Sequence, residues 1–137
     1  MAADSAPALP PLHAMLLAFP IALFTAALVS DLAYLGTAQI QWTNFAAWLI
    51  TFALVFGGMV LVWATVDAVR RRPGALLYLV LLLAMWVFGL INAFQHSKDA
   101  WSSVGTTGLI LSLLSAGLAL AAGWVAFSRS SAREFAR

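Results

Sequence analysis

Four long apolar stretches, separated by short polar segments, occupy most of this chain. They run over about His13–Leu35, Phe45–Val66, Ala75–Gln95 and Thr107–Phe127, and none contains lysine or arginine. Each has about 20 residues, which at 1.5 Å rise per residue matches the hydrocarbon core of a bilayer. A soluble helix of this length would carry a polar stripe, and these stretches carry none along their full length. The pattern predicts an all-α membrane protein with one domain, a four-transmembrane-helix antiparallel up–down bundle.

Composition agrees with a protein made of little besides these spans. Of its 137 residues, 64% are hydrophobic and 9% charged, and none is cysteine. The absence of cysteine excludes disulfides, thiolate nucleophiles and cysteine-based metal sites. No basic stripe with interleaved aromatic residues is present, so nucleic acid is not an expected partner. The partner that composition predicts is the lipid bilayer.

Basic residues lie almost entirely on one side of the predicted spans. Arg70–Arg72 separate the second and third spans, and Arg129, Arg133 and Arg137 follow the fourth, whereas the other side has only Lys98. Because basic residues concentrate in cytoplasmic connections, both termini are expected in the cytoplasm. This predicts a multi-pass protein of the bacterial inner membrane, with residues 36–44 and 96–106 connecting its spans on the periplasmic side.

Polar side chains gather near the predicted periplasmic ends of the first and third spans. Asp31 lies about one turn inside the edge of its span, where an unpaired carboxylate is costly. Asn92 and His96 share one helix face through their i, i+4 spacing. We therefore expect a polar cluster of Asp31, Tyr34, Asn92, His96 and Asp99. It either orders the first and third helices through hydrogen bonds or forms a small-molecule or quinone head-group pocket, a proton site or a docking surface.

Two further features lie on the first span. His13 is expected level with Asp67 at the cytoplasmic end, where the two could pair, with Arg70 or Arg71 as alternative partners for the carboxylate. Pro20 lies inside the span and removes one backbone hydrogen bond, so a bend is expected there. That bend is either a kink tolerated for packing or a hinge.

Small residues at four-residue spacing indicate close helix packing by the fourth span. Such rows let two backbones approach closely in lipid. They serve either packing inside the chain or a homo-oligomer through the fourth span. The rows are Gly108, Ser112 and Ala116, and Ser115, Ala119 and Gly123.

Trp48 and Trp86 lie deeper than the other tryptophans and are expected to pack between helices.

Several strings of the sequence resemble a known family. They are LHAMLLAFPIAL at Leu12–Leu23, Ser30-Asp31, Val66-Asp67 and NAFQHSKDAW at Asn92–Trp101. Together they resemble the bacterial membrane family catalogued as domain of unknown function 2231, over His13 to about Phe127. Here Ala14 replaces the usual proline and a second histidine near the third span is missing, which argues against a histidine-rich site. The resemblance implies a four-helix fold in a bacterial inner membrane. Some members lie beside periplasmic sugar-type dehydrogenases, which suggests a redox partner.

Sequence motifs give no support to catalysis. No P-loop, GxSxG, HExxH, dinucleotide or calcium-loop motif occurs, so neither an enzyme nor a cofactor is expected. The leading hypothesis is a non-enzymatic membrane subunit or anchor that docks a partner, such as a periplasmic redox protein, on its periplasmic face. The alternatives are a small-solute or proton-coupled transporter using Asp31 and a haem- or quinone-binding electron-transfer subunit. His13 and His96 are expected about 30 Å apart, so they cannot ligate one haem together.

Overall fold

The computed structural model describes residues 9–101 and 104–134, and four long helices make up most of them. All four are long and apolar enough to cross a membrane, which confirms the predicted all-α membrane fold. A short 3-10 turn, η1, separates the third helix from the fourth. The elements are α1 (Pro11–Thr37), α2 (Ile40–Val69), α3 (Ala75–Ser97), η1 (Lys98–Trp101) and α4 (Gly105–Glu134).

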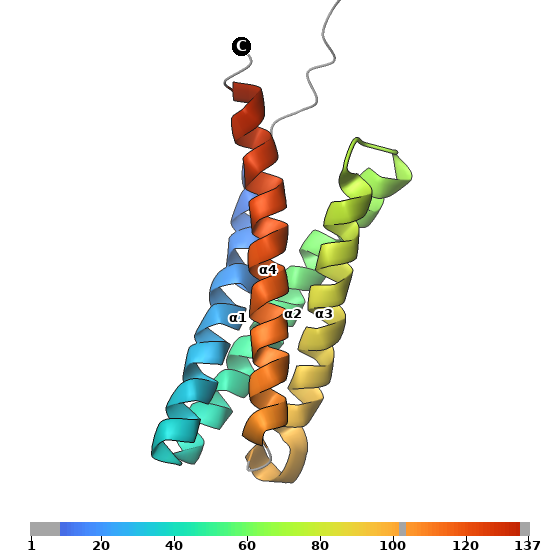
Figure 1. The fold of residues 1–137 in the computed structure, drawn as a ribbon. Helices are drawn as coiled ribbons and strands as arrows, with labels where there is room; N and C mark the ends of the chain where they lie inside the picture. The colour runs from blue at the N-terminus through green and yellow to red at the C-terminus, as the bar shows by residue number, and fades with distance from the viewer. Residues whose placement is uncertain (1–8, 102–103, 135–137) are drawn as a thin grey trace, which may run out of the picture.

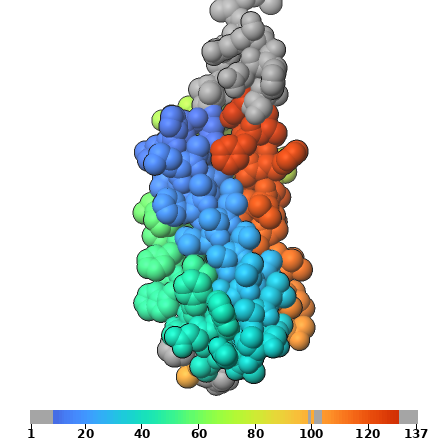
Figure 2. All heavy atoms as spheres, turned by 90° about the vertical axis from the view of Figure 1, so that its left-hand side faces the viewer, coloured from blue at the N-terminus to red at the C-terminus, as the bar shows by residue number. Residues whose placement is uncertain are grey.

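The helices alternate in direction and pack as a ring of neighbours (Figure 1). α1 packs on α2, α2 on α3, α3 on α4 and α4 on α1, so α1 and α3 face each other across a diagonal. Figure 2 shows α1 between α2 and α4. We call the end where α1 begins and α4 ends the terminal end; it also holds the α2–α3 turn. The opposite end, with the α1–α2 turn and η1, is the loop end.

The α1–α2 connection is shorter than the sequence pattern suggests. α2 begins at Ile40, several residues before the apolar stretch that starts at Phe45. Ala38 takes a left-handed conformation (φ 56°), and its N–H donates to the carbonyl of Tyr34 at 2.7 Å. This closes α1 so tightly that α2 starts almost at once. Hydropathy marks the apolar part of a helix, whereas the backbone hydrogen bonds continue through polar residues beyond it.

On α2 and α3 the buried positions follow one another at alternating steps of three and four residues, the spacing of a left-handed bundle, and α1 keeps this spacing apart from the additional buried Ser30. The interior combines small and polar residues with a few large apolar side chains such as Leu17, Phe24 and Ile50, whereas many other large apolar side chains face outward, where lipid would contact them. On α1 the buried positions are His13, Leu17, Pro20, Phe24, Ala27, Ser30 and Asp31; on α2, Thr43, Ala46, Ile50, Ala53, Gly57, Val60 and Ala64; on α3, Ala75, Tyr78, Leu82, Met85, Gly89, Asn92 and His96.

Both small-residue rows of α4 face the interior. Ser112, Ser115 and Ala119 are 0% exposed. A Cβ atom added to Gly123 would lie 2.6 Å from Cδ1 of Ile21 on α1, so the two helices touch closely there. These rows therefore pack within the chain, and a homo-oligomer through the fourth span stays a prediction.

The side chains of Trp48 and Trp86 point in different directions. Trp86 packs inward, and its Nε1–H donates to the carbonyl of Leu54 on α2 at 3.1 Å. This confirms the prediction that Trp86 packs between helices. Trp48 is 59% exposed, so the prediction that it packs between helices is wrong. It lies two residues after buried Ala46 and two before buried Ile50, on the opposite face of α2. Depth along a helix does not determine which face a residue occupies.

Pro20 lies within α1, which continues as a helix on both sides of it, and its side chain is buried. Gly57 of α2 packs opposite, since an added Cβ there would lie 3.8 Å from the proline Cβ and 3.1 Å from Cε of Met85. The proline thus fills the interior beside a residue without a side chain. Its role as a hinge stays a prediction.

We expect Gly89→Ala to destabilise the bundle. The added Cβ would lie 2.6 Å from Cζ of Phe24, a fully buried ring that reaches α3 across the diagonal from α1. Overpacking of this kind costs about 1–3 kcal/mol, measured as the free energy of unfolding by SDS titration in mixed micelles. The control is Gly117→Ala, which meets nothing within 4 Å and should be neutral or slightly stabilising. Equal stability of the two variants would contradict this packing.

Candidate functional site

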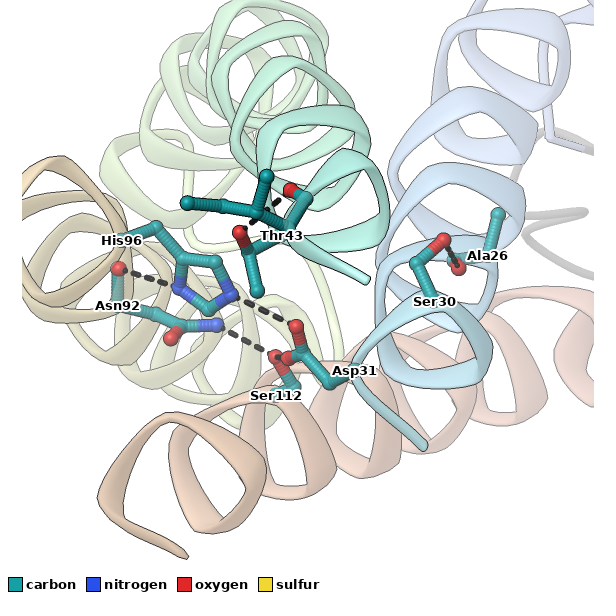
Figure 3. Close-up of polar contacts among 8 residues, drawn as sticks. Ala26, Ser30, Asp31, Thr43, Asn92, His96 and Ser112 are labelled. Carbon is teal, nitrogen blue, oxygen red and sulfur yellow. Dashed lines mark hydrogen bonds and ion pairs between the residues drawn. The ribbon is translucent and has the colours of Figure 1, made fainter. Parts of the chain in front are cut away.

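A buried polar network joins three helices near the loop end (Figure 3). It consists of Asp31 on α1, Asn92 and His96 on α3, and Ser112 on α4, and every member is 0% exposed. Asn92 and His96 lie one turn apart on the inward face of α3, as their spacing predicts. The heptad-like pattern of buried positions turns all four side chains toward the same part of the interior.

Hydrogen bonds link all four side chains, although Oδ1 of Asn92 is buried without a hydrogen-bond partner among the described residues. The carboxylate of Asp31 faces His96 Nε2 through Oδ1, at 2.8 Å, and accepts a bond from the Ser112 hydroxyl through Oδ2. The Ser112 oxygen in turn accepts from Nδ2 of Asn92 at 2.8 Å. Nδ1 of His96 lies 3.0 Å from the backbone carbonyl oxygen of Asn92. Each of the four residues thus touches at least one other by a polar contact.

Hydrogen-bond roles fix the number of protons that the network holds. Both ring nitrogens of His96 face oxygen atoms, and a carbonyl oxygen can only accept. Nδ1 must therefore carry a proton, and a second proton must lie between Nε2 and the Asp31 carboxyl group. The pair is then neutral overall, either as imidazolium and carboxylate or as imidazole and carboxylic acid. Neutrality removes most of the cost of an ionisable group inside a membrane.

Serine, histidine and aspartate together do not form a catalytic triad here. A triad needs the serine hydroxyl to donate to an imidazole nitrogen, which then removes its proton. The Ser112 hydroxyl instead donates to the carboxylate of Asp31, and His96 Nε2 bonds the same carboxylate. No imidazole nitrogen faces the Ser112 hydroxyl, and the contacts of the network join α1, α3 and α4.

The structure unites only part of the predicted cluster. Asp31, Asn92 and His96 meet as expected. Tyr34 is half-buried on α1, one turn beyond Asp31, and within the described residues its side chain makes no hydrogen bond to the network. Asp99 belongs to η1, but its side chain lies outside the described part of the chain.

Sequence reasoning missed two interior hydroxyl groups at this end. Ser112 was assigned only to a small-residue row, although it bonds both Asp31 and Asn92. Its depth in the fourth span, close to that of Asp31 in the first, was the available signal. The other is Thr43 of α2, which is fully buried and whose Oγ1 donates to the carbonyl of Ile40 at 2.8 Å (Figure 3).

At the terminal end, the expected pair of His13 and Asp67 does not form. Nε2 of His13 lies 2.7 Å from the Tyr78 hydroxyl oxygen, across the same α1–α3 diagonal. Asp67 pairs instead with Arg72, at 3.0 Å, rather than with either arginine before it. The chain reverses after α2 with Arg71 at φ 53°, which returns Arg72 toward the last turn of the helix.

The histidines offer little to a metal or a haem. Within residues 9–101 and 104–134, no group of three His, Asp or Glu side chains could hold a metal ion. Both ring nitrogens of His96 are engaged, and His13 lies at the opposite end of the bundle. Ligation of haem by His96 would require at least one of its two ring contacts to break.

Comparison with known proteins places the chain in a family. The family model described as "Predicted membrane protein (DUF2231)" matches residues 9–127. The chain belongs to this family. The match includes every residue of the polar network and confirms the resemblance seen in the sequence. No curated protein and no solved structure matches the chain.

We expect Asp31 and His96 to be energetically coupled. Removing either side chain alone leaves its partner buried and unpaired, which costs about 3–5 kcal/mol in the free energy of unfolding. Asp31→Ala, His96→Ala and the double variant form a cycle in which the double variant should lose clearly less than the sum of the two singles. SDS titration in mixed micelles provides the measurement.

A matched control is available in Thr51→Ala. The Thr51 hydroxyl is exposed and bonds only the carbonyl of Ala47 in its own helix, so its removal should change stability by no more than about 0.5 kcal/mol. Strictly additive losses for Asp31 and His96 would show that the two side chains do not share a bond.

Proposed function

We propose that this protein is a non-enzymatic membrane subunit that anchors a partner, such as a redox protein, at its loop end. The observation that supports this proposal is that most polar groups of the network are used to hold helices together. Its hydroxyl group, its carboxylate and both imidazole nitrogens are used to join helices α1, α3 and α4. Groups engaged in this way suit a rigid scaffold better than a site that binds and converts a substrate.

The outer surface at the loop end has the character of a docking face. A hollow of about 430 Å³ lies at the start of α2, lined by amide and aromatic side chains. Exposed aromatic groups beside polar groups are typical of the energetic centre of an interface. The hollow is lined by Gln39, Gln41, Trp42, Asn44, Phe45 and Trp48.

We further propose that the loop end is periplasmic and that the protein lies in a bacterial inner membrane. The turn with Arg70–Arg72 lies at the terminal end, together with Arg129, whereas Lys98 lies at the loop end. The excess of basic residues at the terminal end supports this orientation, because such residues concentrate on the cytoplasmic side of membrane proteins.

Single-cysteine labelling tests this orientation, because the chain has no cysteine of its own. Gln39→Cys and Pro73→Cys each place one thiol in an exposed turn, at the loop end and the terminal end respectively. In intact cells a membrane-impermeant maleimide should label position 39 and should reach position 73 only after permeabilisation. The reverse pattern would overturn the orientation.

Purification in mild detergent tests the anchoring role. A tag at the C-terminus should recover a companion protein in a fixed ratio from native membranes. Trp42→Ala should lose most of this companion because it removes an aromatic wall of the hollow, whereas Trp124→Ala, at an exposed site on α4, should retain it. A solitary protein or homo-oligomer from native membranes would refute anchoring.

The alternative functions stay predictions. Transport through Asp31 would require the network to open, since its carboxyl group is fully buried and holds both His96 and Ser112. Electron transfer through a haem would require the His96 contacts to break. Anchoring is the role that needs neither change.

A further inference from the structure

A second hollow lies on the outer side of α2 at the terminal end. It has a volume of about 460 Å³ and combines an apolar wall with charged groups at its mouth. None of the groups in the polar network takes part in it. The hollow is lined by Pro10, Met59, Val62, Trp63, Val66, Asp67, Arg70 and Arg72.

The wall of this hollow suits an acyl chain. Met59, Val62 and Val66 follow one another along one stripe of α2 and are 49%, 67% and 43% exposed. Trp63 lies between them, and the ring of His13 packs against it edge-on, with centroids 5.0 Å apart and planes at 85°. The indole is therefore backed by a buried side chain and keeps the shape of the wall.

The mouth of the hollow suits a phosphate group. Nη1 of Arg72 is held by Asp67 at 3.0 Å, which leaves the other N–H groups of its guanidinium free to donate. Arg70 makes no ion pair or side-chain hydrogen bond within the described residues. Two guanidinium groups against one carboxylate leave the mouth positive. Arginine pairs readily with phosphate oxygens, in a fork geometry that matches them.

We propose that this hollow binds one anionic phospholipid. The phosphate lies against Arg70 and Arg72, and one acyl chain runs along Met59, Val62 and Val66. A free anion would gain nothing from the apolar wall. A zwitterionic lipid would place its cationic head group beside the positively charged mouth of the hollow, where the two would repel each other. Basic sites beside membrane-spanning helices recognise anionic lipids by this combination.

Native mass spectrometry of the full chain in detergent tests the site with phosphatidylglycerol and phosphatidylcholine of identical acyl chains. Phosphatidylglycerol should bind more tightly, and Arg70→Gln and Arg72→Gln should each weaken it about five-fold. Arg71→Gln is the matched control, since this arginine belongs to the same turn but does not line the hollow, and it should change binding less than two-fold. Equal losses for all three variants would show diffuse attraction and overturn the site.

Blocking the wall tests the acyl-chain part separately. Val62→Trp fills the hollow and should abolish retention of phosphatidylglycerol, whereas Val55→Trp, at an exposed position outside the hollow, should not. Inorganic phosphate should fail to displace the lipid at equal concentration. Displacement by phosphate, or equal binding of the two lipids, would refute a phospholipid site.

Discussion

A carboxyl group inside a bilayer needs a partner that shares or neutralises its charge, and Asp31 obtains one from His96 on the diagonally opposite helix. This bond determines how α1 and α3 face each other at the loop end. Ser112 adds α4 to the same carboxylate, so one group on α1 fixes two other helices. In lipid no hydrophobic force gathers the helices, which makes such bonds and close packing the main source of order.

The diagonal is crossed at three levels, by a different interaction at each. His13 bonds Tyr78 at the terminal end, Phe24 packs on Gly89 in the middle, and the polar network closes the loop end. Because polar bonds join both ends, the helices cannot slide past one another without breaking a buried contact. A bundle fixed in this way presents its outer hollows with constant shape, which is what the proposed docking and lipid sites require.

Much of the fold could be predicted from hydropathy, because helices that cross a bilayer must be long, apolar and internally hydrogen-bonded. The meeting of Asp31, Asn92 and His96 could be predicted because all three had to lie at similar depth. The partner of His13 could not, since depth alone does not say which neighbouring helix a side chain faces. Ser112 was missed for a different reason: a serine suits close packing and hydrogen bonding equally well.

The contact between His96 and Asp31 can be measured directly by solid-state NMR of the protein in lipid bilayers. The chain has only two histidines, so a His13→Phe variant leaves the ring nitrogens of His96 unambiguous. With nitrogen-labelled histidine and carbon-labelled aspartate, Nε2 should show a dipolar coupling to the Asp31 carboxyl carbon, as a 2.8 Å contact requires, and Nδ1 should carry a proton. An absent coupling, or an Nδ1 without a proton, would contradict the network on which this account of the bundle depends.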